Sequence, residues 1–295
     1  MTLQGFSSRS KQGLYRSLQA FGQGTPPSRL LYGLTVGNNV VYVCDYLNHK
    51  ILSYQLDGTK IDEWGTFGTT DGLIDRPSAV KWYNSEVYVK DYSGRVQVFS
   101  ESGTWDRTIL TSVTKFDVYG GYIFSVSNSG TAPFYTTTFK KSDTDGVLDS
   151  SFVFVNSALT FVNYERGILF AITWEDRSGS TDVIYYILNE DGSISTEINV
   201  DATYPSNQAI QLSNLGVDAT YLYTYSNPFL YKHEIGGTFN SRVAFSLPAF
   251  TSLPDMDYYG GSLYFTANYN DPLVNSKVRI HSASTLAFDT EWTAT

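Results

Sequence analysis

Three histidines and one cysteine have the widest capacity for metal binding and nucleophilic chemistry in this 295-residue sequence. A zinc site needs three or four ligands that converge on one point, and catalysis by cysteine needs a thiolate beside a basic group. His49 follows one short apolar segment, whereas His233 and His281 lie in two others much further along the chain. Cys44 lies in the apolar run 40–44 and is predicted to be a small buried side chain. We therefore expect no catalytic residue, no histidine-based metal site and no cofactor.

A second set of polar residues offers oxygen atoms near the ends of short apolar segments. Hard divalent cations prefer oxygen ligands, so carboxylates and amides that converge on one mouth of a ring of strands could hold one ion. The candidates are Asp45, Asp91, Asn128, Asn227 and Asn268 at strand ends, with Asp117 and Asp257 on inner strands. Each of them is equally typical of a turn or a strand end. The set therefore supports metal-dependent hydrolysis only as an alternative function.

The composition indicates what kind of fold must position these residues. Aromatic residues make up 16% of the chain and charged residues 17%, and there are 24 glycines. Aromatic and β-branched residues favour pleated strands, whereas Gly, Asn and Asp favour tight turns. A helical period of 3.6 residues does not recur over any useful length. The sequence therefore predicts an all-β protein.

Charge and hydropathy exclude several classes of partner. The formal net charge is −9 and no run of lysine or arginine occurs, so a nucleic-acid partner is not expected. Residues 1–13 lack the apolar stretch of a secretory signal, and no segment reaches 18 consecutive apolar residues. We expect a soluble protein without membrane insertion, located in a cytoplasm or in a virus particle.

Two series of short segments recur along the chain at a period of about 45 residues. The first series consists of apolar, aromatic-centred segments that each follow a turn signal: 41–43, 87–89, 123–125, 169–171, 222–224 and 263–265. The second series consists of turns that end in glycine, spaced 45, 43, 46 and 45 residues apart: Gly58, Gly103, Gly146, Gly192 and Gly237. Each repeat has room for four short strands. In the first repeat we predict them at 31–36, 40–45, 50–56 and 60–64.

Four antiparallel strands per repeat of this length are typical of a β-propeller blade. We predict an all-β, six-bladed β-propeller with four-stranded antiparallel blades, formed by residues 1–295 as a single domain. The predicted blades are approximately 25–66, 77–110, 113–155, 158–200, 210–246 and 250–293. Residues 1–24 are predicted to close the ring, with Leu14–Phe21 as the outer strand of the last blade. The C-terminal stretch Thr285–Trp292 competes for the same position.

The first repeat carries a recognisable motif after its second strand. The residues are Asp45-x-x-Asn48-His49-Lys50-Ile51. This repeat resembles an NHL repeat over its full length, and the second repeat retains the matching segments 87–91 and 94–96. The resemblance implies that the Asn-His-Lys-Ile element shapes the connection between the second and third strands of a blade. It also implies a fold whose members bind proteins or RNA, and whose relatives of the same shape include lactonases and lyases. The negative charge makes RNA the least expected of these ligands.

The connections between second and third strands are predicted to share one rim of the ring. Aromatic side chains next to Asn and Asp suit recognition of a protein or a glycan. The rim candidates are Asp45, Tyr46, Asn48, His49, Asp91, Tyr92, Asn128, Trp174, Asp176, Asn227, Asn268 and Tyr269. We predict a non-catalytic binding or assembly module that uses one propeller face. The Tyr- and Asn-rich composition resembles that of viral or phage structural and receptor-binding proteins, and a metal-dependent lactonase-like hydrolase or lyase is the alternative.

Overall fold

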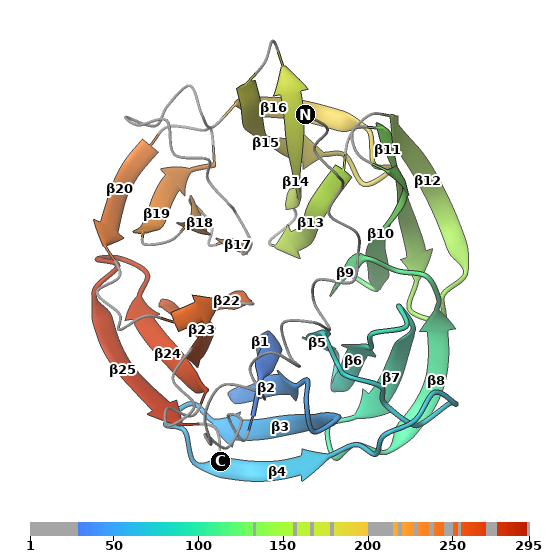
Figure 1. Ribbon diagram of the computed structural model, residues 1–295, viewed down its shortest axis with the longest axis vertical. Helices are drawn as coiled ribbons and strands as arrows, with labels where there is room; N and C mark the ends of the chain where they lie inside the picture. Colours follow the sequence, from blue (N-terminus) through green and yellow to red (C-terminus); the bar gives the residue numbers. More distant parts are fainter. Residues whose placement is uncertain are drawn as a thin grey trace, which may run out of the picture.

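A computed structural model shows an all-β molecule whose sheets are arranged around a common axis (Figure 1). The structure describes residues 29–131, 134–155, 158–165, 168–177, 180–199, 215–217, 220–226, 229–235, 239–244, 250–252, 255–269 and 276–293. Within these ranges every regular element is a strand, and the strands form six antiparallel sheets. The prediction of an all-β protein built from four-stranded antiparallel sheets is confirmed.

Five of the sheets have four strands in chain order, with the first strand nearest the axis (Figure 1). The first two sheets consist of β1 (Leu31–Gly37), β2 (Val40–Asp45), β3 (Lys50–Gln55) and β4 (Lys60–Trp64), and of β5 (Ala79–Tyr83), β6 (Glu86–Lys90), β7 (Val96–Ser100) and β8 (Trp105–Leu110). The third sheet consists of β9 (Lys115–Tyr119), β10 (Tyr122–Thr131), β11 (Phe134–Asp143) and β12 (Leu148–Val155). The fourth and fifth consist of β13 (Ala158–Glu165), β14 (Ile168–Arg177), β15 (Ser180–Leu188) and β16 (Ile194–Asn199), and of β17 (Leu215–Val217), β18 (Tyr221–Ser226), β19 (Phe229–Glu234) and β20 (Phe239–Ala244).

The last sheet corrects our prediction about its outer strand. It consists of β21 (Phe250–Ser252), β22 (Met256–Tyr259), β23 (Ser262–Tyr269), β24 (Lys277–Ser282) and β25 (Phe288–Thr293). The C-terminal strand β25 pairs with β24, in the position that we predicted for Leu14–Phe21. A short connection joins β24 to β25, so their pairing closes a much smaller loop than pairing with the N-terminus would. The predicted N-terminal strand lies outside the described residues.

The hydrophobic core lies between neighbouring sheets. Tyr42 and Cys44 of β2 pack with Val80 and Val87 of the second sheet. Cys44 is fully buried, as its apolar surroundings in the sequence predicted. Core residues lie on both faces of the middle strands β2 and β3, so consecutive residues of these strands are buried.

The first and last sheets also contact each other, although they lie at opposite ends of the chain. The Asn268 side chain accepts a hydrogen bond from the Leu31 amide at 2.9 Å and donates one to the Leu31 carbonyl at 2.6 Å. The Asp255 carboxylate accepts from the Leu34 amide at 3.0 Å, and Asp257 accepts from the Val36 amide at 2.7 Å. Side chains of the last sheet thus satisfy main-chain groups of β1.

Two of the three histidines lie on third strands, away from the axis (Figure 1). His233 on β19 is 3% exposed, and His281 on β24 is also buried. Burial disfavours the charged imidazolium; it lowers the pKa of His233 to about 4 and also lowers the pKa of His281. His49 lies elsewhere, in the turn between β2 and β3, where its ring contacts Phe67.

We expect acidification to destabilise the protein through His233 before most carboxylates titrate. The neutral imidazole contributes its full stability to the folded state above pH 6.5, the pKa in the unfolded chain. This stability is lost as the pH falls towards the folded pKa of about 4. The loss amounts to about 3 kcal/mol of unfolding free energy between pH 7 and pH 4. Urea unfolding at pH 7, 6, 5 and 4 measures it, and the variant His233→Phe is expected to show a smaller decrease. An equal decrease in the wild type and the variant would contradict this assignment.

Candidate binding surface

Asp45, at the end of β2, holds the connection to β3. Its carboxylate accepts hydrogen bonds from the Asn48 amide at 3.2 Å and from the Asn48 side chain at 2.8 Å. Arg29 contacts the same carboxylate at 2.6 Å, and Asp45 is fully buried. Asp91, at the corresponding end of β6, accepts hydrogen bonds from Ser93 and Arg95 and is 1% exposed. Both predicted rim carboxylates are therefore parts of hairpin turns.

The other predicted rim residues occupy less uniform positions. Asn128 lies within β10 and accepts a hydrogen bond from Thr137 at 2.5 Å, while Asn268 is buried against β1. Trp174 and Asp176 lie within β14, and Tyr269 ends β23, where the structure describes only the backbone. Asn227 lies outside the described residues.

The second and third strands of the third and fourth sheets are longer than we predicted. The segments around Asn128 and Trp174 were expected to be loops, but they continue the hairpins β10–β11 and β14–β15 up to the pairs Thr131–Phe134 and Arg177–Ser180. Thr and aromatic residues in these segments, such as Tyr135, Thr136 and Trp174, favour continued strand pairing.

The oxygen atoms that we considered for a divalent cation do not fit such an ion where the structure describes them. The described donors bond to protein groups, and Asp117 lies 3.4 Å from the Lys81 ammonium group across the inner strands. Although burial opposes the charge, Asp117, Asp255 and Asp257 raise the pKa of Lys81. Among the described residues, no group of three or more His, Cys, Asp or Glu side chains is placed to hold a metal ion.

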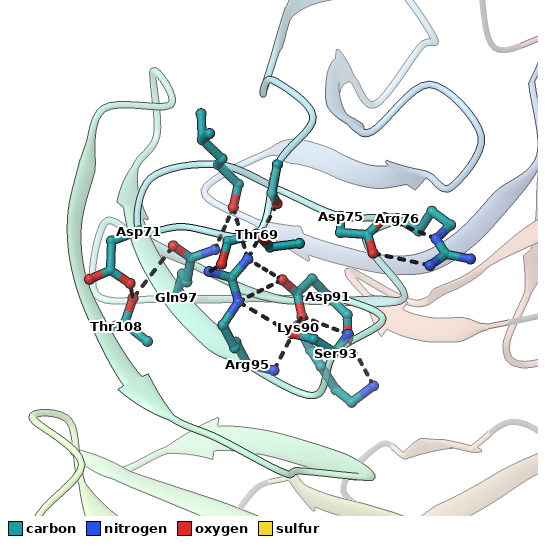
Figure 2. A network of polar contacts seen from close by, with 12 residues as sticks. Thr69, Asp71, Asp75, Arg76, Lys90, Asp91, Ser93, Arg95, Gln97 and Thr108 are labelled. Carbon is teal, nitrogen blue, oxygen red and sulfur yellow. Dashed lines mark hydrogen bonds and ion pairs between the residues drawn. The ribbon is translucent and has the colours of Figure 1, made fainter.

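The connection from β4 to β5 covers the second sheet, and two side chains of β7 and its preceding turn hold it there (Figure 2). Arg95 donates to the carbonyl groups of Thr69 at 2.7 Å and Leu73 at 3.2 Å, while it also pairs with Asp91 at 2.5 Å. Gln97 accepts from the Gly72 amide and donates to the Leu73 carbonyl, each at 2.9 Å. The connection therefore has a fixed conformation despite its lack of strands, because buried side chains satisfy its main-chain groups.

This fixed connection brings Arg76 against aromatic residues of the first two sheets. The Arg76 guanidinium lies 3.8 Å from the ring centre of Tyr92 and 5.9 Å from that of Tyr46. The rings of Tyr46 and Tyr92 meet edge to face at 6.5 Å, and Tyr32 stacks on Tyr46 at 4.5 Å. Cation–π and edge-to-face contacts of this kind each stabilise the arrangement by about 0.5–1.5 kcal/mol.

A second aromatic contact continues this surface. The ring of His49 lies 4.5 Å from that of Phe67, and its Nδ1 accepts a hydrogen bond from the Arg76 amide at 3.0 Å. Tyr92 is 60% exposed and Phe67 is 62% exposed. We refer to Tyr46, His49, Phe67, Arg76 and Tyr92 together as the aromatic patch.

The charge of Arg76 is balanced within the protein. Its guanidinium donates to both carboxylate oxygens of Asp75, at 2.9 and 3.0 Å. The hydrogen bond from Arg76 lowers the pKa of Asp75 and the same pairing raises that of Arg76. The two parallel hydrogen bonds also fix the position of the guanidinium, which contacts Tyr92.

The structure brings together three of the predicted rim residues, Tyr46, His49 and Tyr92, with exposed Asn48 beside them. It adds Phe67 and Arg76, which we did not predict as site residues. Both lie in a Gly-rich segment without strand periodicity. The sequence signal that could have indicated them is a phenylalanine in a Gly-rich segment, where no strand is expected to bury it.

Comparison with known proteins identifies the class of fold. No family model and no curated protein matches the sequence. The WD40 β-propeller domain of Doa1 has a TM-score of 0.55 at 11% identity, over 92% of this chain and 84% of its own. The β-propeller domain of Cps50 (Swd1) from Myceliophteria thermophila has a TM-score of 0.53 at 12% identity, over 80% of each chain. The WD40 domain of Pan2 from Neurospora crassa has 0.52 at 11%, over 86% of this chain and 76% of its own.

At such low identity the similarity shows the fold alone: the chain is a β-propeller. In the part of the chain that the structure describes, no helix has the length and apolar character needed to cross a membrane.

Proposed function

We propose that this chain is a six-bladed propeller of the NHL-like kind that serves as a non-catalytic interaction module, with the aromatic patch as its contact surface. One observation carries the proposal: two large aromatic rings, those of Tyr92 and Phe67, are exposed on one rim while neighbouring side chains hold them in place. A receptor-binding or structural role on a virus particle stays a prediction from composition.

Exposed apolar side chains that gather on one surface are typical of an interaction site. Tyr and Arg are enriched among the residues that dominate binding energy. The Arg76 guanidinium and the His49 ring order the two exposed rings before any partner arrives. Less conformational entropy is therefore lost when a partner binds.

The metal-dependent hydrolase receives less support. Its proposed donors Asp45 and Asp91 are buried in hairpin turns, and Asn268 bonds to the main chain of β1. An oxygen that already accepts two or three protein hydrogen bonds has little capacity left for a cation. The interaction module is therefore the function that the described geometry supports best.

The test is a screen of the immobilised chain against protein and glycan arrays, followed by affinity measurements with variants. We expect Tyr92→Ala and Phe67→Ala to weaken binding of the ligand at least about tenfold, because each removes a central ring of the contact surface. Tyr119→Ala is the matched control, since this half-exposed tyrosine ends β9 at the opposite rim. A ligand whose affinity is unchanged by both patch variants would overturn the proposal.

A further inference from the structure

The aromatic patch offers flat apolar surfaces of a defined kind. One face of the Tyr92 ring is covered by the Arg76 guanidinium at 3.8 Å, and most of the rest of the residue is exposed. The Phe67 ring is fixed on one side by His49 and is otherwise open. The negative face of an aromatic ring attracts the weakly positive hydrogens of C–H groups. Each ring can therefore receive a ligand that presents a layer of C–H bonds.

The charges around these rings are already paired within the protein. Arg76 pairs with Asp75, Arg95 with Asp91 and Arg29 with Asp45, all at 3.0 Å or less. An anionic or cationic ligand would have to compete with these short, partly buried pairs. A neutral ligand loses nothing to them, and it does not depend on the net charge of −9.

The centre of the patch is polar. The Arg76 guanidinium contacts Tyr92, and the Arg76 amide donates to His49, whose ring contacts Phe67, so the polar residue Arg76 links the two exposed rings. Two ring surfaces separated by hydrogen-bonding groups match a ligand whose own apolar faces and polar groups alternate.

A chain of neutral pyranose rings has this character. One face of a pyranose carries C–H bonds that pack on an aromatic ring, and its hydroxyl groups form hydrogen bonds with polar groups beside that ring. We infer that the aromatic patch binds a neutral saccharide chain through stacking on Tyr92 and Phe67. This inference rests on the proposed function and names the ligand class of the same surface.

The experiment is a glycan array that carries neutral and sialylated oligosaccharides, followed by calorimetric titration of the neutral glycan with the strongest signal. We expect its affinity to fall at least tenfold in Tyr92→Ala, to be retained within threefold in Tyr92→Phe, and to stay unchanged in Tyr119→Ala. Raising NaCl from 50 to 500 mM is expected to change the affinity less than twofold, because no charge pairing with the ligand is involved.

The two proposals fail separately. If the protein bound only sialylated glycans, the saccharide inference would be overturned and the interaction module would stand. The same would follow if its only ligand were a protein whose affinity depends on Tyr92. A neutral glycan whose affinity is equal in Tyr92→Ala and in the wild type would also overturn the inference. If neither Tyr92→Ala nor Phe67→Ala changed the affinity of any glycan or protein ligand, both proposals would be overturned.

Discussion

Replacing Arg95 with alanine is expected to lower the free energy of unfolding by about 3–5 kcal/mol, the cost of breaking a buried ion pair from one side. The substitution leaves the Asp91 carboxylate, which is 1% exposed, without its guanidinium partner. It also removes the donors to the Thr69 and Leu73 carbonyl groups. Because these carbonyls belong to the β4–β5 connection, the loss affects both stability and the position of the aromatic patch.

Urea unfolding measures the change in free energy, and hydrogen exchange at the amides of Gly72 and Ile74 reports on the connection itself. Arg107→Ala is the matched control, because Arg107 makes a more exposed ion pair with Glu86 and is expected to cost less than about 1 kcal/mol. If Arg95→Ala destabilised the protein no more than Arg107→Ala, Arg95 would not be the anchor of this connection.

Local periodicity made the sheets predictable. The strands of the first repeat were predicted at 31–36, 40–45, 50–56 and 60–64, and the observed bounds differ by no more than one residue. Apolar runs and glycine turns determine such hairpins within a few residues of sequence. The outer strand of the last sheet was predicted wrongly because two segments, Leu14–Phe21 and Thr285–Trp292, have similar strand character. The composition of the two segments does not show which of them pairs with β24, the one close to it in sequence or the one at the other end of the chain.

The residues of the candidate site could be predicted only where they occupy equivalent positions in successive repeats. Tyr46 and Tyr92 occupy equivalent positions after β2 and β6, so their proximity follows from the stacking of two sheets. Arg76 and Phe67 lie in a connection whose path depends on Arg95 and Gln97, more than 20 residues further along the chain from most of it. Local patterns contain no information about such long-range side-chain anchors. The roles of Asp45 and Asp91 were similarly ambiguous, because a turn and a ligand site use the same residue type.

Glycines of the regular turn series are required for packing as well as for the turns, because the neighbouring sheet leaves no space for a side chain at Gly103. Gly103 has a φ of +82°, and a Cβ there would lie 2.3 Å from Cγ of Trp64, at the end of the outer strand of the preceding sheet. Gly103→Ala therefore combines a left-handed backbone with overpacking against a buried tryptophan. These contribute about 1–2 and 1–3 kcal/mol, so we expect the free energy of unfolding to fall by about 2–5 kcal/mol.

Gly121→Ala separates the two contributions, because Gly121 has nearly the same φ, +83°, and no atom within 4 Å of its added Cβ. Only the backbone cost of about 1–2 kcal/mol is expected there. Gly58→Ala should match Gly103→Ala, since its Cβ would lie 2.4 Å from Cγ of Trp292 on β25. That contact joins the last sheet to the first, so urea unfolding of this variant measures how firmly the two ends of the chain pack together. Equal effects of Gly58→Ala and Gly121→Ala would show that Trp292 does not hold this seam in solution.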